Sequence, residues 1–177
     1  MELVKSSGGV LMPQHKISVR GEYTGQIIRE GVIIDEWTDS NLVVNEGLDA
    51  LNNIMFFAST QITAWYLGLF EGNYTPVATV TAATITAAST ETTAYASATR
   101  PAYTAVASAT QTETNAAARA SFIFNATKTI YGAFMVSSSA KGGTGGTLFS
   151  AARFAAQKSV VNLDELLLTY TFTASSI

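Results

Sequence analysis

Alternating β-branched and aromatic residues, broken by short glycine or asparagine turns, constrain the fold of this chain more than any other feature. The stretch HKISVRGEYTGQIIREGVIIDEWTDSNLVV begins at His15 and places Ile17, Val19 and, after Gly21, Tyr23 on alternate positions. Glu30-Gly31 separates QIIR from VIIDEW. This pattern predicts a β-hairpin closed by a short glycine turn.

Strand-like runs return in the last third of the chain. They are ARASFIFNA, TIYGAFMVSSS, TLFSAARFAA and SVVNLDELLLTYTFTA, with the last strand expected from Glu165 to Thr173. About eight short strands favour an all-β fold. We expect an antiparallel two-sheet β-sandwich, jelly-roll-like, with residues 15–177 as a single domain and residues 1–14 as an extended N-terminal arm.

One short helix is expected between the early and late strands. Leu48, Leu51 and Met55 recur at helical spacing, and Asn45 is a suitable N-cap for a helix from Glu46 to Phe57. The following TAWYLGLF, Thr63 to Phe70, is almost continuously apolar, which predicts a strand buried on both faces. Residues 78–121 are dominated by Ala, Thr and Ser. Alanine favours helix and threonine favours strand, and we expect a long ordered surface loop with short strands.

Composition narrows the function classes. The 177 residues include no cysteine and carry a net charge of −3, so thiolate metal sites are excluded and a basic footprint for direct nucleic-acid binding is missing. Charged residues make up 13% of the chain, about half of the usual ~25%. Such a surface predicts contacts with other subunits. No apolar run reaches the ~18 residues of a membrane helix, so no membrane partner is expected.

The glycine loop from Lys141 to Thr147, KGGTGGT, has the ingredients of a phosphate site. A nucleotide P-loop ends in Gly-Lys-Ser/Thr and opens a helix, whereas here the lysine precedes the glycines. Strand-like sequence flanks the loop on both sides, which predicts a hairpin tip. We expect Lys141 to contact a neighbouring subunit, and Gly145→Val to affect assembly or folding.

Catalytic and metal chemistry find little support. His15 is the only histidine, and no Gly-x-Ser-x-Gly elbow accompanies it. Asp35, Glu36 and Asp39 lack the ligand spacing and glycine of an EF-hand, and they are interpreted as turn carboxylates at strand ends. No enzyme activity, cofactor or metal is therefore expected.

Candidate contact residues come from two other segments. Pro101 restricts Arg100 to extended backbone, and Tyr103 follows, so the segment suits a subunit contact or an ordered loop that packs on its own sheet. The arm carries an apolar cluster. The candidate subunit contacts are Val10, Leu11, Met12, Arg100, Tyr103 and Lys141.

Several motifs together resemble structural proteins of tailed bacteriophages. The module GEYTGQIIREGVIIDEWTDSNLVVNEGLDAL is similar to one in which a hairpin is followed by Asn-Leu-hydrophobic and then Gly-Leu-Asp. The matching residues are Asn41, Leu42, Val43, Asn45, Gly47, Leu48 and Asp49. WYLGLF, ATRPAYT, IYGAFMVSSSAKGGTGGTLFSAARF and LLLTYTF resemble pieces of small phage virion proteins. The resemblance covers residues 16–173.

This resemblance implies a non-enzymatic virion protein, assembled in the host cytoplasm. A capsid decoration or cement protein is the first expectation, with the major capsid protein and copies of itself, as a homotrimer, for partners. A tail or head-to-tail component, such as a collar or fibre adaptor, is the alternative. A carbohydrate-binding attachment module is a third possibility, and it requires Trp37 or Trp65 on an exposed aromatic platform.

Overall fold

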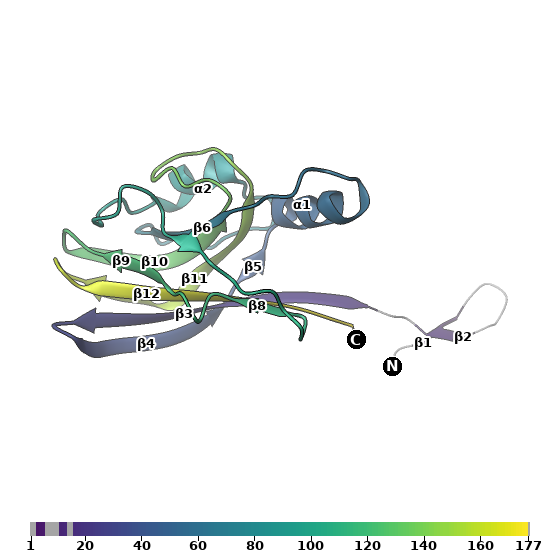
Figure 1. Ribbon diagram of the computed structural model, residues 1–177, viewed down its shortest axis with the longest axis horizontal. Helices are drawn as coiled ribbons and strands as arrows, with labels where there is room; N and C mark the ends of the chain where they lie inside the picture. The colour runs from purple at the N-terminus through teal and green to yellow at the C-terminus, as the bar shows by residue number, and fades with distance from the viewer. Residues whose placement is uncertain (1–2, 6–10, 14–15, 177) are drawn as a thin grey trace.

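In the computed structural model, two antiparallel sheets pack face to face (Figure 1). The structure describes residues 3–5, 11–13 and 16–176. The first sheet has the order β4-β3-β12-β8, with β9 also on β12, and consists of β3 (Ile17–Arg29), β4 (Val32–Ser40), β8 (Thr112–Thr114), β9 (Ala120–Ile123) and β12 (Glu165–Ser176). The second has the order β5-β11-β10-β6-β7 and consists of β5 (Leu42–Val43), β6 (Trp65–Phe70), β7 (Ala102–Tyr103), β10 (Lys128–Val136) and β11 (Leu148–Val160). The predicted all-β two-sheet sandwich is confirmed.

Both predicted hairpins form, each within one sheet. Glu30 and Gly31 have φ of 51° and 79°, the left-handed pair that a two-residue turn between twisted strands requires. Strands β10 and β11 pair from Val136↔Leu148 outward, so the glycine loop lies at their tip as expected. The chain crosses between the sheets from β4 to β5, from β7 to β8, from β9 to β10 and from β11 to β12.

The main core lies between the two sheets. Alternate residues of β3, such as Tyr23 and Ile27, point inward and are almost fully buried. They meet inward residues of the second sheet in one apolar cluster. Its large members are Tyr23, Ile27, Leu67, Leu69, Tyr95, Phe122, Phe124, Ile130, Met135, Phe149, Phe154, Leu166, Leu168 and Tyr170.

A second core covers the outer face of the second sheet. Phe70, Phe134 and Val136 point to this side and pack against Ile85 of the helix α2 (Ala82–Ser89). The sheet is therefore buried on both faces, which confirms the expectation for the TAWYLGLF strand and explains its lack of alternation.

The expectation of a single helix is wrong, because α2 lies inside the Ala/Thr-rich segment. Thr81 and Thr84 form a capping box at its start, and Ala82 and Ile85 are buried. Alanine propensity and the apolar surface of the second sheet together outweigh the β preference of the threonines. The remainder of residues 78–121 is ordered loop with short strands, as predicted.

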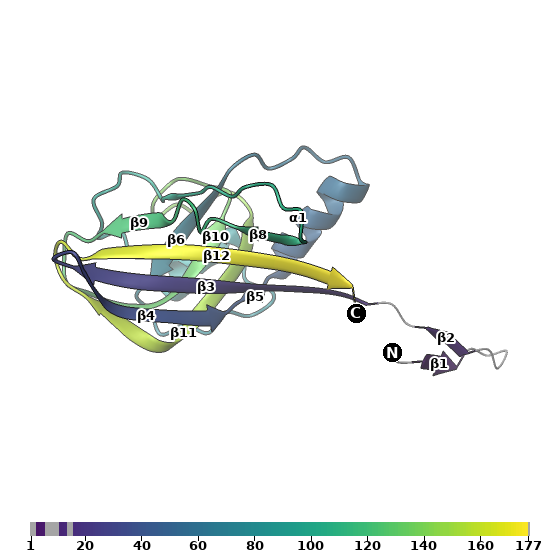
Figure 2. The same ribbon diagram turned by 60° about the horizontal axis from the view of Figure 1, so that its bottom comes forward.

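The first helix, α1 (Asn45–Phe56), projects at one end of the sandwich (Figure 2). Its bounds agree with the prediction to within one residue, but the predicted N-cap, Asn45, is wrong. Val44 occupies the N-cap position without a side-chain bond, and Asn45 is already helical. The Asn45 N–H is satisfied instead by the carbonyl of Ala78, at 2.9 Å.

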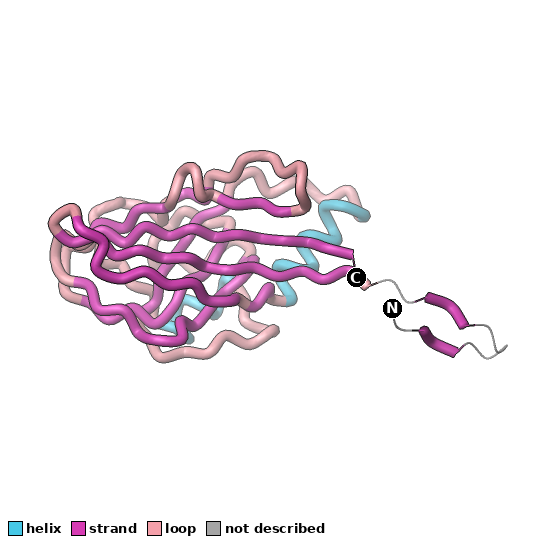
Figure 3. The backbone as a smooth tube through the Cα atoms, turned by 90° about the horizontal axis from the view of Figure 1, so that it is seen from below, coloured by secondary structure: helices cyan, strands magenta, loops and turns pink. Residues whose placement is uncertain are grey.

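The described residues of the N-terminal arm form a hairpin of their own. Strands β1 (Leu3–Lys5) and β2 (Leu11–Pro13) pair antiparallel, with Leu3 opposite Pro13. They make a separate two-stranded sheet that lies beyond the end of the β3–β12 ribbon (Figure 3). The expected single extended arm is thus partly a β pair.

Candidate interaction surface

The motif from Asn41 to Asp49 connects the first sheet to α1, and its side chains fix the position of this connection. The Asn41 Nδ2 donates to the Tyr170 hydroxyl at 3.1 Å. A Cβ on Gly47 would lie 2.4 Å from the Phe149 carbonyl oxygen, so only glycine lets the helix approach β11 this closely. The Glu46 Oε2 accepts N–H bonds from Ala82 and Leu148, both at 2.8 Å. These residues therefore join α1, α2 and β11.

Beyond this anchor, α1 is poorly covered. Gly47 is its only fully buried residue, while Leu48, Leu51 and Ile54 are half-buried. The last two residues of the helix and its C-cap are three consecutive large apolar residues, Met55, Phe56 and Phe57, with exposed fractions of 66%, 81% and 79%. We call these three residues the α1 tip. Such a contiguous apolar surface is rare on a monomeric protein unless it serves an interface.

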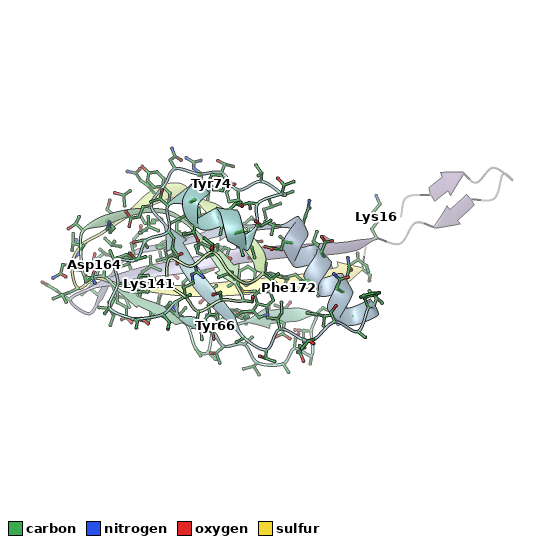
Figure 4. All side chains as sticks on the ribbon, turned by 90° about the horizontal axis from the view of Figure 1, so that it is seen from above. Lys16, Tyr66, Tyr74, Lys141, Asp164 and Phe172 are labelled. Carbon is green, nitrogen blue, oxygen red and sulfur yellow. The ribbon has the colours of Figure 1, made fainter. Side chains whose placement is uncertain are left out.

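A cavity of about 740 Å³ opens between α1 and the sandwich. Ala50, Leu51 and Ile54 form its helical wall. Its floor consists of five aromatic residues, Trp65, Tyr103, Phe149, Tyr170 and Phe172. We call it the aromatic groove. Figure 4 labels Phe172, which lies beside α1.

The aromatic rings of the floor contact one another edge to face. Phe149 is central: its centroid is 5.5 Å from Trp65, 5.4 Å from Phe172 and 6.4 Å from Tyr170. Tyr103 contacts Tyr170 at 5.9 Å. A rigid floor of this kind loses little conformational freedom when it binds an apolar partner.

Two polar groups interrupt the apolar lining. The Tyr103 hydroxyl is buried without a hydrogen-bond partner among the described residues. Burial, with smaller effects of Tyr170 and Glu113, raises the Tyr103 pKa well above its ordinary value, so the hydroxyl stays protonated at neutral pH. Glu113 is the only charged residue that lines the groove in the described part of the chain. The groove can thus take an apolar ligand that carries a polar or cationic group.

A second cavity, of about 660 Å³, lies along a neighbouring face of α1, shares Ala50, Ile54 and Ile62 with the aromatic groove, and is more polar. Its charged lining residues are Glu46 and Asp49, and no described Lys or Arg lines either cavity. The charged residues that line the two cavities along α1 are therefore all acidic.

Arg100 is not a surface contact, which corrects the expectation from sequence. Its side chain is 1% exposed and forms a bidentate ion pair with the buried Glu91, with N–O distances of 2.8 and 2.6 Å. It also donates to the carbonyls of Ser138 and Gly143, and lies over the Phe134 ring. The alternative interpretation, an ordered loop packed on its own sheet, is the one observed.

The glycine loop completes this arrangement. The Gly142 N–H donates to Glu91 at 3.1 Å, and the Lys141 Nζ donates to the carbonyls of Tyr95 and Ser97 while lying over the Tyr95 ring. We call loop 137–147 with Glu91 and Arg100 the clasp. The ammonium of Lys141, which Figure 4 labels, thus has partners within the chain, and its expected contact to another subunit stays a prediction.

The other candidate contacts fall in three places. Tyr103 lies in the aromatic groove and remains a candidate contact. Leu11 and Met12 are in β2, opposite Lys5 and Val4. Val10 and the histidine at position 15 lie outside the described residues.

The tryptophans and carboxylates have internal partners. Trp37 and Trp65 are half-buried and pack edge to face on Phe154 and Phe149. Asp35 pairs with Lys158 at 3.0 Å, and Asp39 accepts the Ala155 N–H at 3.1 Å. Both carboxylates lie within β4 and reach β11, so the interpretation as turn residues is wrong.

The described residues contain no group of three or more His, Asp or Glu side chains placed to hold a metal ion. None of the described helices is long and apolar enough to span a membrane.

Comparisons with known protein families and with curated proteins find no match to this chain. The surface around α1 is therefore interpreted from its own geometry.

Sequence reasoning missed the α1 tip and the aromatic groove. The run Met55-Phe56-Phe57 at the predicted helix end was a usable signal, because only part of it can face the core at helical spacing. The groove could not be read from sequence, because its floor comes from strands distant in the chain.

Proposed function

We propose that this chain is a non-enzymatic structural protein of a tailed-phage virion, and that it binds a capsid protein through the end that carries α1. The observation that carries the proposal is the α1 tip: three large apolar side chains, each at least 66% exposed, in one run. Their burial in an interface would contribute about 1.5–3 kcal/mol per side chain.

The choice of a decoration or cement protein rests on the motif resemblance of residues 16–173, and the low charge of the chain supports it. The anchor around Glu46 and Gly47 adds a physical reason. It fixes the N-terminal end of α1 to β11 of the second sheet and to α2, while the tip projects. A rigid helix that offers apolar side chains suits a hydrophobic groove on a partner.

Labelling of particles tests the proposal. Virions of the phage that encodes the chain, together with separated DNA-filled heads and tails, would be treated with a gold-labelled antibody against the recombinant protein. We expect label over the heads, at hundreds of copies by gel densitometry. Absence of the chain from purified particles would refute the proposal.

Label restricted to tails, at about six to a few dozen copies, would favour the tail or head-to-tail alternative. The aromatic groove supports the carbohydrate-binding alternative, because Trp65 and Tyr103 are partly exposed in its floor beside Glu113. That alternative predicts binding in a glycan array that is lost in Trp65→Ala, and no label on tail-free heads.

A further inference from the structure

The aromatic groove has the size and lining of a ligand-binding site. Five aromatic residues form its floor, α1 forms one wall, and the Tyr103 hydroxyl is buried without a partner among residues 16–176. A cavity of about 740 Å³ falls within the range of sites that enclose a ligand or a short peptide. Its chemistry favours an aliphatic or methionine-containing segment with a nearby cation.

The first sixteen residues of the chain have this chemistry. They contain the apolar clusters Leu3-Val4 and Val10-Leu11-Met12-Pro13, and two lysines against the single acid Glu2. Charged lining residues around α1 are all acidic, namely Glu46, Asp49 and Glu113. Apolar content and charge are therefore complementary between the N-terminal residues and the surface that flanks α1.

The described arm strands lie outside the two-sheet sandwich. Ile17 at the start of β3 is fixed opposite Ser176 of β12, and β1 and β2 lie beyond this ribbon, away from the two sheets (Figures 1 to 3). The described arm strands pair only with each other. Since α1 and the N-terminal ribbon share one end of the molecule, an arm can reach a groove on an adjacent copy.

We propose that the aromatic groove binds the N-terminal residues of a second copy of this chain, with Leu11–Pro13 of β2 against the aromatic floor. The net positive charge of that N-terminal segment complements the acidic Glu113. The inference rests on the proposed structural role and deepens it, because it assigns the groove to contacts between copies and leaves the α1 tip for the capsid protein.

Sedimentation of the full chain and its variants tests the inference. We expect the full chain to form oligomers, and an excess of a synthetic peptide of residues 1–16 to dissociate them. Leu51→Glu places a charge in the groove wall and Leu11→Glu places one on the arm. Each should weaken assembly by about 30-fold, as loss of a hot-spot contact does.

Asn52→Glu is the matched control, because it adds the same charge to the next helical residue, which is exposed and lines neither cavity. It should assemble as the full chain does. Ala50→Trp fills the groove with an apolar side chain and should also block assembly, which separates occupancy of the groove from misfolding of a charged variant.

A monomeric full chain would overturn the inference, and so would Leu51→Glu or Leu11→Glu oligomers of unchanged stability. Glycan binding that depends on the groove, without assembly, would overturn it in favour of the carbohydrate alternative. Failure of the capsid proposal is distinguishable: particles would then lack the chain, while assembly of the purified protein would still depend on Leu51 and Leu11.

Discussion

The clasp and the α1 end both lie in connections between strands, but they differ in how their side chains are placed: those of the clasp are buried and paired, and those of the α1 end are exposed or unpaired. In the clasp, Arg100 and Glu91 are buried. All three guanidinium nitrogens of Arg100 and both carboxylate oxygens of Glu91 have hydrogen-bond partners inside the chain. At the α1 end, apolar side chains are exposed and the Tyr103 hydroxyl has no described partner. The contrast indicates that the clasp serves folding, and it supports the proposal that the α1 end serves binding.

The largest expected effect is in the clasp. Arg100→Ala should lower the free energy of unfolding by about 3–5 kcal/mol, because it leaves the Glu91 carboxylate buried and unpaired. Chemical denaturation measures this loss. The double variant Glu91→Leu with Arg100→Met removes both charges and should recover most of the lost free energy of unfolding. A loss under ~1 kcal/mol in Arg100→Ala would contradict the view that the clasp, unlike the α1 end, serves folding.

The glycines of the loop offer an internal comparison. Gly146 has φ of +94°, and a Cβ there would lie 2.8 Å from the Ser137 Oγ, whereas Gly145 has open space around it. Gly146→Val should therefore cost about 1–3 kcal/mol in thermal unfolding. Gly145→Val should fold normally. Of the two effects expected from sequence for this variant, on assembly or on folding, only the effect on assembly is then left.

Two buried tyrosines allow a hydrogen-bonded hydroxyl to be compared with one that has no partner. The Tyr23 hydroxyl is 2.8 Å from the Ser150 Oγ, whereas the buried Tyr95 hydroxyl has no partner among the described residues. Tyr23→Phe should lose about 1–1.5 kcal/mol, while Tyr95→Phe should be neutral or gain up to ~1 kcal/mol. Equal losses in urea titrations of the two variants would show that the Tyr95 hydroxyl is bonded in solution.

A smaller effect concerns acid stability at the end of the sandwich far from α1. The Asp164 carboxylate accepts hydrogen bonds from Arg29, at 2.8 and 2.7 Å, and these lower the Asp164 pKa from its ordinary value of 3.8. A lowered pKa stabilises the fold above the unfolded value and loses this contribution as the pH falls below about 3.8. Stability measured between pH 5 and 2 should thus fall less steeply in Asp164→Asn. Identical slopes would contradict the pairing.

The sequence predicted those parts of the fold that depend on local pattern. Alternation located β3, strand-like runs located β4, β10 and β11, and the glycine turns gave both hairpins, because strand pattern and turn chemistry act over a few residues. It missed α2, where alanine and threonine preferences compete, and the second core that decides between them. The buried ion pair of Arg100 could not be predicted either, because Glu91 and the carbonyl of Gly143 contact Arg100 only in the folded chain.

The binding role of the α1 tip is tested most directly by the double variant Met55→Asp with Phe56→Asp. Both side chains are mostly exposed, so the free energy of unfolding should change by no more than ~0.5 kcal/mol. Binding to virions stripped of the native protein, measured against Asn52→Asp as control, should weaken by at least ~30-fold. A folded double variant that binds stripped particles as tightly as the control would contradict the account.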